Sequence, residues 1–217
     1  MTGAVLWDMD GTLVDSEEQH WLSWRDTMAA EGMPVTREQF VETFGMRNDA
    51  ILPRWLGDRA TTDIIQRVGD AKEELYRKLV RRDGLAPLAG AAEWLERLKE
   101  AGWRQAIASS APGANVEVVL EVLGLAGLFE AIVSAEDVTA GKPDPQVFLT
   151  AASRLGVGPS QCIVVEDAAA GVEAARRAGM RSIGVSRDGR LAADLAVSSL
   201  RELAPDAFEN LLKPTSV

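Results

Sequence analysis

The chain has 217 residues, enough to bury a full hydrophobic core in one domain with an insertion or in two small domains. Hydrophobic residues make up 47% and charged residues 26%, as in ordinary globular proteins, and no apolar stretch approaches the roughly 20 residues that cross a bilayer. The formal net charge of −10 argues against nucleic acid and membranes as partners, and it also repels phosphorylated substrates unless a cation and positive side chains are present.

The cysteine content and the N-terminal residues bear on the compartment. The single cysteine, Cys162, cannot form an internal disulfide and lies in an apolar run, where a buried and inert side chain is expected. The first residues show no basic segment followed by an apolar one, so no secretory signal is expected. We therefore expect a cytoplasmic protein. One cysteine and one histidine also argue against a structural zinc site.

The first predicted element is a buried strand over residues 4–7, which leads directly into Asp8. Asp8 would lie at the carboxyl end of a strand, where open parallel sheets bind their ligands. Gly11 lets the backbone turn sharply after a second acid, Asp10. Two carboxylates on such a turn can serve a metal ion and a reacting phosphoryl group together.

From residue 15 to about residue 83 the sequence is helical. Helices are expected over 16–31, after the capping box that begins at Thr36, around Ile51 with a bend or interruption at Pro53, and over 62–82. These roughly 70 residues predict a compact helical insertion with its own core. The apolar face of the long helix would carry Ile64, Val68, Ala71, Leu75 and Leu79.

From residue 84 onward strands and helices alternate. This alternation predicts a parallel sheet with helices on both faces, and therefore an α/β fold. The expected strands are 104–108, 131–133, 162–165 and 182–185, and the expected helices are 91–101, 115–123, 146–155 and 170–178.

Polar residues follow four of the predicted strands. Asp and Ser at such positions commonly cap the next helix, so one position alone would carry little information. Because the carboxyl ends of parallel strands share one edge of the sheet, all four together indicate a ligand site. The residues are Asp8 with Asp10, Ser109 with Ser110, Lys142, and Glu166 with Asp167.

Four stretches of the chain, in this order, resemble the four signatures of the haloacid dehalogenase-like hydrolases. They are Asp8-Met9-Asp10-Gly11-Thr12-Leu13-Val14-Asp15-Ser16, Ser109 at the end of the second strand, Gly141-Lys142-Pro143-Asp144-Pro145, and Val164-Val165-Glu166-Asp167. The resemblance implies a Rossmann-like core of residues 1–14 and 84–217, with helices on both faces of a parallel sheet. It also implies an all-α helical cap domain of residues 15–83 that closes over the substrate.

The resemblance further assigns catalytic roles. Asp8 would be the nucleophile that forms an aspartyl-phosphate, and Asp10 would protonate the leaving oxygen and then deprotonate the attacking water. Ser109 and Lys142 would hold the phosphoryl oxygens. Mg²⁺ is the implied cofactor, because hard cations prefer oxygen ligands. Its implied ligands are Asp8, the backbone carbonyl of Asp10, Asp167, and Glu166 as a ligand or an outer partner.

The remaining candidate residues would bind the phosphate or the rest of the substrate. Those of the core are Met9 and Ser110, and those of the cap are His20, Arg47 and Lys72. Arg47 is a candidate for a second anionic group. The cap tryptophans at helical spacing are expected to pack in the interior.

Asp10 distinguishes the chemistry within the family. The dehalogenases lack this second acid, because they have no alkoxide leaving group that needs a proton. A phosphonate-cleaving relative would need a Schiff-base lysine in the cap, for which Lys72 is a weak candidate, and the Asp-x-Asp pair argues against it. The sequence therefore predicts a Mg²⁺-dependent phosphatase acting on a small phosphorylated metabolite, such as a sugar phosphate or a similar phosphomonoester. A monomer is expected, because the cap must move.

Two alternatives remain open. One is a hexose-phosphate mutase similar to β-phosphoglucomutase, since His20 and Lys72 occur where such mutases have polar cap residues. Those mutases also have a lysine before the loop glycine, where this chain has Phe44, and their following arginine is shifted in position relative to Arg47. The other alternative is a non-enzymatic binding module on the same fold.

Overall fold

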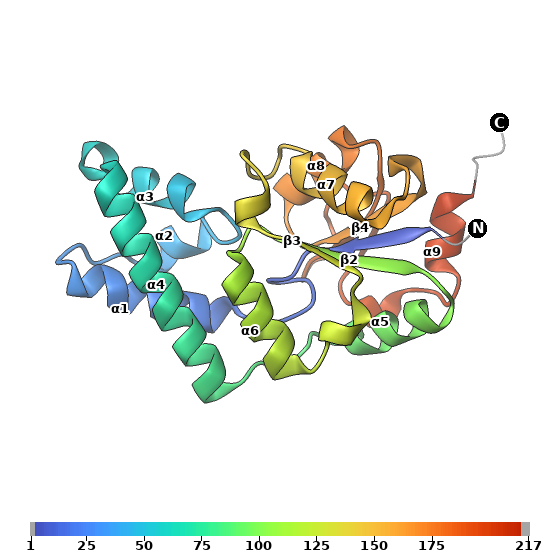
Figure 1. Ribbon diagram of the computed structural model, residues 1–217, viewed down its shortest axis with the longest axis horizontal. Coiled ribbons are helices and arrows are strands. Elements are labelled where there is room, and N and C mark those ends of the chain that lie inside the picture. Colours follow the sequence, from blue (N-terminus) through green and yellow to red (C-terminus); the bar gives the residue numbers. More distant parts are fainter. Residues whose placement is uncertain (1–2, 214–217) are drawn as a thin grey trace.

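The fold is a six-stranded sheet with a helical insertion, seen in the computed structural model, which describes residues 3–213 (Figure 1). All neighbouring strands are parallel, in the order β3-β2-β1-β4-β5-β6. The predicted α/β class is confirmed. The strands are β1 (Ala4–Trp7), β2 (Arg104–Ala108), β3 (Ala131–Val133), β4 (Cys162–Glu166), β5 (Arg181–Val185) and β6 (Leu195–Val197).

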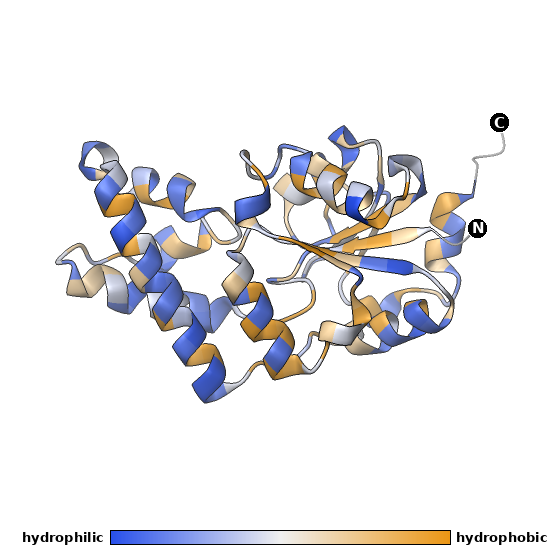
Figure 2. Cartoon of the chain, in the orientation of Figure 1, coloured by the Kyte–Doolittle hydropathy of each residue, from blue (hydrophilic) through white to orange (hydrophobic). Residues whose placement is uncertain are grey.

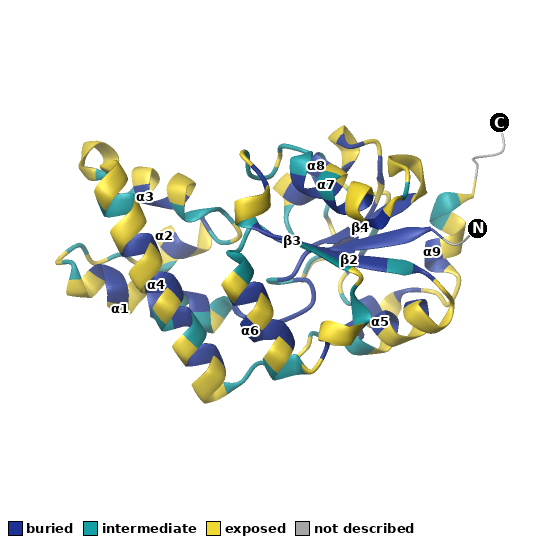
Figure 3. Ribbon diagram, viewed as in Figure 1, coloured by how far each residue is buried: buried dark blue, intermediate teal, exposed yellow. Residues whose placement is uncertain are grey.

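The central strands are buried on both faces because their side chains alternate between two apolar layers. Val5 and Trp7 of β1 belong to one layer, and Ala4 and Leu6 belong to the other. Strands are mostly hydrophobic and buried, while the outer helix faces are exposed (Figures 2 and 3). One layer is covered by α5 (Ala91–Glu100), α6 (Gly113–Leu123) and α9 (Ala207–Leu212), the other by α7 (Gln146–Leu155) and α8 (Ala169–Arg177).

Two of these elements, β6 and α9, lie outside the sequence prediction. β6 has three residues at the edge of the sheet, and its place is set by pairing with β5, where Leu195 lies opposite Ile183. α9 is a short helix that places the buried Phe208 against the rings of Trp7, Trp94 and Trp103. Both elements are therefore fixed by contacts with distant residues rather than by local pattern.

The insertion after β1 is a helical cap with its own apolar cluster, centred on Trp24, Met28, Phe40 and Leu52. Its helices are α1 (Glu17–Ala30), α2 (Arg37–Val41), α3 (Asn48–Leu56) and α4 (Thr62–Asp83), with a short 3₁₀ turn, Gly57–Arg59, after α3. No helix among residues 3–213 has both the length and the apolar character that a membrane crossing requires.

Two local expectations for the cap have different outcomes. The capping box of α2 is present: the Thr36 hydroxyl accepts the backbone N–H of Gln39, and the Gln39 side chain accepts the N–H of Thr36. Of the bend or interruption expected at Pro53, the interruption is wrong, because α3 continues through this residue as one helix, and the bend stays a prediction. The boundaries of the cap at residues 15 and 83 stay a prediction.

The buried face of α4 coincides with the predicted apolar face at Val68 and Leu79 but not along the rest of the helix. Ala71 is exposed and Leu75 is only partly buried, whereas Lys72, Glu73 and Tyr76 are buried. Helical spacing predicts only an apolar stripe, but here two charged side chains, Lys72 and Glu73, pair where the cap meets α6 of the core. The helix is therefore rotated so that its polar residues face inward.

The two connections between sheet and cap lie side by side. Val14 forms an antiparallel bridge with Pro87, and the N–H of Leu88 donates to the carbonyl oxygen of Leu13 at 2.8 Å. Two adjacent crossings are the arrangement that a hinge between cap and core requires.

Candidate active site

The polar strand ends meet at one cavity of about 890 Å³ between the sheet edge and the cap. Met9 is the exception among the predicted site residues, since its side chain packs in the apolar core and only its backbone could contact a phosphate. The predicted residues that line the cavity are Asp8, Asp10, Ser109, Ser110, Lys142, Glu166 and Asp167 from the core, and His20, Arg47 and Lys72 from the cap.

Lys142 links two acids at the centre of this edge. Its Nζ lies 2.5 Å from Oδ1 of Asp8 and 2.6 Å from Oε1 of Glu166. The loop that carries it is tied to α7, because the Gln146 side-chain oxygen accepts the backbone N–H of Thr139 at 2.9 Å. Although burial alone would lower the pKa of Lys142, the two carboxylates raise it, so the side chain is a fixed positive charge.

Three carboxylates gather around this ammonium. One oxygen each of Asp8, Glu166 and Asp167 can be chosen so that all three lie within 4.8 Å of one another. Burial, with repulsion between the acids, raises the pKa of Asp8 to about 7, against the pull of Lys142, and that of Asp167 to about 8. Three acids against one ammonium leave excess negative charge, and oxygen donors this close suit a hard divalent cation. The cluster can therefore hold a metal ion.

Two glycines allow the close approach of these acids. A Cβ on Gly11, whose φ is +85°, would lie 2.0 Å from Oδ2 of Asp167. A Cβ on Gly171, in the first turns of α8, would lie 1.9 Å from the carboxylate of Glu166. The same carboxylate accepts the backbone N–H of Ala168 at 3.0 Å, just before α8 begins. The N-terminus of α8 is thus packed directly against the cluster, where a helix favours negative charge.

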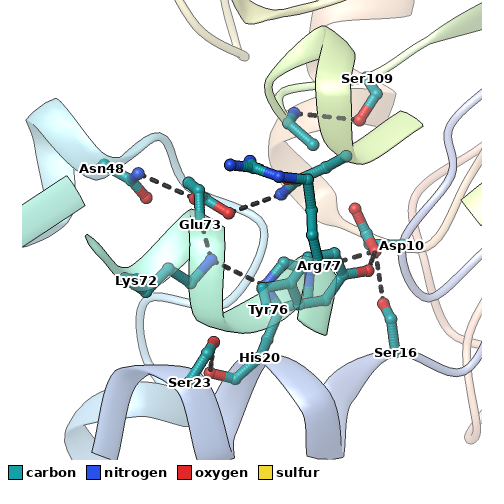
Figure 4. Close-up of polar contacts among 12 residues, drawn as sticks. Asp10, Ser16, His20, Ser23, Asn48, Lys72, Glu73, Tyr76, Arg77 and Ser109 are labelled. Atoms are coloured by element: carbon teal, nitrogen blue, oxygen red, sulfur yellow. Dashed lines mark hydrogen bonds and ion pairs between the residues drawn. The ribbon is translucent and has the colours of Figure 1, made fainter. Parts of the chain in front are cut away.

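Asp10 points toward the cap instead of toward Lys142. Its Oδ1 accepts the hydroxyl of Ser16, lies 3.2 Å from Nε2 of His20 and lies 3.5 Å from the hydroxyl of Tyr76 (Figure 4). Burial alone would raise the pKa of Asp10, but His20 and the Ser16 hydrogen bond lower it. Ser16 is the N-cap residue of α1, which begins at Glu17, but its hydroxyl donates to Asp10 and does not cap the helix.

The wall of the cap continues this hydrogen-bonded chain. Nδ1 of His20 lies 2.9 Å from Nζ of Lys72, and Tyr76 stacks on the His20 ring with centroids 4.0 Å apart. Lys72 in turn contacts Glu73 at 3.0 Å. Ser16, Glu73 and Tyr76 are site residues that were not predicted from the sequence. The sequence offered one indication for Tyr76: it lies one helical turn after Lys72 on α4, and therefore on the same face.

The guanidinium of Arg47 is already bound by groups of the protein. Arg47 donates to the backbone carbonyls of Ala135 at 2.8 Å and Val138 at 3.4 Å and pairs with Asp49, so it connects cap to core. Its expected role with a second anion stays a prediction.

Ser109 is 2% exposed at the end of β2, and its Oγ accepts the N–H of Ala111 at 3.0 Å. The Ser109 hydroxyl is thereby fixed at the cavity.

Comparisons with known proteins identify the family. A model of the haloacid dehalogenase-like hydrolases matches residues 2–179. Hexitol phosphatase B of Escherichia coli K12 is 34% identical over 213 residues, with 92% of this chain and 93% of that protein covered. Beta-phosphoglucomutase of Bacillus subtilis is 32% identical, with 92% and 91% covered. The crystal structure of CbbY from Rhodobacter sphaeroides in complex with phosphate superimposes with a TM-score of 0.88 at 28% identity and covers 96% of this chain and 100% of that one. The chain therefore belongs to the haloacid dehalogenase-like hydrolases, and it is an enzyme of the branch that includes beta-phosphoglucomutase, CbbY and the hexitol phosphatases.

Proposed function

We propose that the protein is a Mg²⁺-dependent phosphatase that hydrolyses a small phosphorylated carbohydrate through an aspartyl-phosphate on Asp8. The observation that carries the proposal is the position of Asp8 at the end of β1, on the cavity surface. There its carboxylate is held 2.5 Å from Lys142, in a cluster with Glu166 and Asp167. A carboxylate fixed beside a permanent positive charge is suited to attack a phosphorus atom whose oxygens need neutralisation.

In the first step a carboxylate oxygen of Asp8 bonds to phosphorus while the bond from phosphorus to the leaving oxygen breaks. Asp10 donates a proton to that leaving oxygen, so the alcohol departs neutral. In the second step Asp10 takes a proton from water, the water oxygen bonds to phosphorus, and the bond to Asp8 breaks to release phosphate. The lowered pKa of Asp10 suits its role as the base in the second step. The imidazole of His20, 3.2 Å away, is a nearby group through which Asp10 can take up the proton that it donates in the first step.

Lys142 and Ser109 would bind the phosphoryl oxygens during both steps. Lys142 contributes a fixed charge, and the Ser109 hydroxyl contributes a hydrogen bond. Asp8, Asp167 and the backbone carbonyl of Asp10 would hold the Mg²⁺. Glu166 would orient Lys142, since its carboxylate is 1% exposed and already accepts Lys142 and the N–H of Ala168. When bound, Mg²⁺ supplies neutralisation of the phosphoryl charge that the three acids would otherwise repel.

The carbohydrate substrate class comes from the relatives. They include hexitol phosphatase B and a fructose-1-phosphate phosphatase, both of Escherichia coli. A relative from Thermotoga maritima, 31% identical over 218 residues, is a phosphorylated carbohydrates phosphatase. A cavity of about 890 Å³ has room for a hexose-sized ester.

A screen of phosphate esters tests the proposal. The protein is incubated with Mg²⁺ and hexitol, hexose, pentose and triose phosphates, and released phosphate is measured. A sugar 1-phosphate is assayed for both free phosphate and the sugar 6-phosphate. Free phosphate supports the phosphatase, and conversion to the 6-phosphate without phosphate release identifies a mutase. Absence of turnover over the whole panel would favour a binding module.

A further inference from the structure

Three donors on three helices converge on the carboxylate of Glu73. Nδ2 of Asn48, from α3, lies 2.8 Å from Oε1, and Nζ of Lys72 lies 3.0 Å from the same oxygen. Nδ2 of Asn115, from α6 of the core, lies 2.5 Å from Oε2. Glu73 is 6% exposed and lines the cavity. Its carboxylate is therefore a built feature of the cap wall rather than a solvated surface charge.

The donors are fixed in this orientation. Asn115 is fully buried, and Nη1 of Arg77, one turn after Glu73 on α4, donates to its Oδ1 at 2.9 Å. This bond turns the amide nitrogen of Asn115 toward Glu73. Although burial alone would raise the pKa of Glu73, Lys72 and His20 lower it, with help from the two amides. Glu73 is thus ionised while it occupies the site.

Two amide nitrogens and an ammonium converging on one point form the donor set that a phosphate or carboxylate group of a ligand would use. Here the protein's own anion fills that set. We propose that Glu73 is a specificity-determining residue, which restricts the enzyme to phosphate esters whose leaving group is uncharged and rich in hydroxyls. Esters with a second phosphate or a carboxylate on the leaving group are rejected. This inference rests on the proposed phosphatase function.

The neighbouring arginines do not offset this restriction. Arg47 is bound to the carbonyl oxygens of Ala135 and Val138 and to Asp49. Arg77 is used to orient Asn115. A second anion placed at this wall would meet the Glu73 carboxylate in a partly dry site, where like charges repel strongly and a mismatched partner is excluded. Hydroxyl groups carry no such penalty.

Matched pairs of esters test the inference on the wild-type protein. Hexitol monophosphate is compared with hexitol bisphosphate, and glycerol phosphate with phosphoglycerate, by kcat/KM in the presence of Mg²⁺. We expect the uncharged leaving group to be preferred by about tenfold or more in each pair, which corresponds to about 1.4 kcal/mol. Equal kcat/KM values within the pairs would overturn the inference. This test uses only the wild-type protein, so it does not depend on whether any variant folds.

The Glu73→Gln variant assigns the effect to this residue. It removes the charge and keeps one of the two acceptor oxygens, so the preference within each pair should fall about tenfold, mainly through KM of the charged ester. Asp63→Asn is the matched control, because it removes one charge from the exposed first turn of the same helix, away from the cavity, and should leave the preference unchanged. A folded Glu73→Gln protein with the wild-type preference contradicts the inference.

Two measurements separate this inference from the proposed function. Hydrolysis of p-nitrophenyl phosphate with Mg²⁺ reports phosphatase chemistry without a carbohydrate or a second anion. Calorimetric binding of the same paired esters to Asp8→Asn protein reports selectivity without turnover. If p-nitrophenyl phosphate is not hydrolysed but Asp8→Asn protein still binds the uncharged member of each pair more tightly, only the proposed phosphatase function is refuted. Turnover of p-nitrophenyl phosphate with equal binding within the pairs refutes only the role of Glu73. If Asp8→Asn protein binds neither member of any pair, the role of Glu73 is refuted as well.

Discussion

Nε2 of His20, on the cap helix α1, lies 3.2 Å from Oδ1 of Asp10, on the turn that follows β1. This contact joins the proposed acid and base to the cap, and it is made while Asp8 is bound to Lys142 on the core side. In the proposed mechanism, cap position and proton transfer are therefore coupled, because a cap that moves away takes His20 away from Asp10. Leaving-group dependence is the direct measure of this function of Asp10.

Asp10→Asn should slow hydrolysis of alkyl phosphates by about 10²–10⁴-fold, because the amide cannot protonate the leaving oxygen. Formation of the aspartyl-phosphate from p-nitrophenyl phosphate should be slowed much less, since p-nitrophenolate departs without a proton. Single-turnover kinetics of both esters measure the difference. The control is Asp15→Asn, which changes an exposed acid in the same segment. Equal losses for both esters would exclude Asp10 as the acid.

Mg²⁺ should stabilise the folded protein, because a cation held by Asp8 and Asp167, beside Glu166, relieves the repulsion between these acids. Asp167→Asn should raise the melting temperature of the metal-free protein by a few degrees, about the effect of 1 kcal/mol at this size, and abolish the rise on adding Mg²⁺. Thermal melts in EDTA and in Mg²⁺ check both effects.

The control for this experiment is Asp58→Asn, an exposed acid in the 3₁₀ turn of the cap, which should keep the wild-type response to Mg²⁺. Activity should follow the same order: EDTA stops turnover and Mg²⁺ restores it in the wild-type protein and in Asp58→Asn. A full Mg²⁺-dependent rise in the melting temperature of Asp167→Asn would refute its assignment as a ligand.

Gly171→Ala should reduce kcat by about tenfold or more and destabilise the fold by about 1–3 kcal/mol, because the new methyl group displaces the Glu166 carboxylate. Glu166 holds Lys142, so the ammonium moves with it. Gly127→Ala is the matched control, since a Cβ there meets nothing within 4 Å. Steady-state kinetics and denaturant unfolding provide the comparison, and wild-type kcat in Gly171→Ala would disprove the tight packing at α8.

The sheet and the convergence of its polar ends could be predicted because both follow from local pattern. Short apolar runs that end in acids mark strands, and parallel strands bring their carboxyl ends to one edge. Asp8 and Lys142, 134 residues apart in sequence, are in contact for this reason. β6 and α9 could not be predicted, because edge pairing and the burial of Phe208 depend on distant residues.

The cap wall could not be predicted because apolar spacing describes only the hydrophobic part of an interface. Lys72 and Glu73 are buried as a pair, and Asn115 of α6, in the core, supplies a further partner for Glu73. A sequence rule that treats charged helix residues as exposed misplaces the inner face of α4. Arg47 illustrates the same limit, since its partners are backbone carbonyls 88 and 91 residues away.

Trapping of the phosphorylated enzyme tests the central claim most directly. Wild-type protein is mixed with Mg²⁺ and an excess of p-nitrophenyl phosphate, quenched in acid within the first turnover, and mapped by peptide mass spectrometry. The account predicts one acid-stable, alkali-labile phosphoryl group on Asp8, and neither label nor turnover in a folded Asp8→Asn variant. A phosphoryl group on another residue, or undiminished hydrolysis by Asp8→Asn, would contradict it.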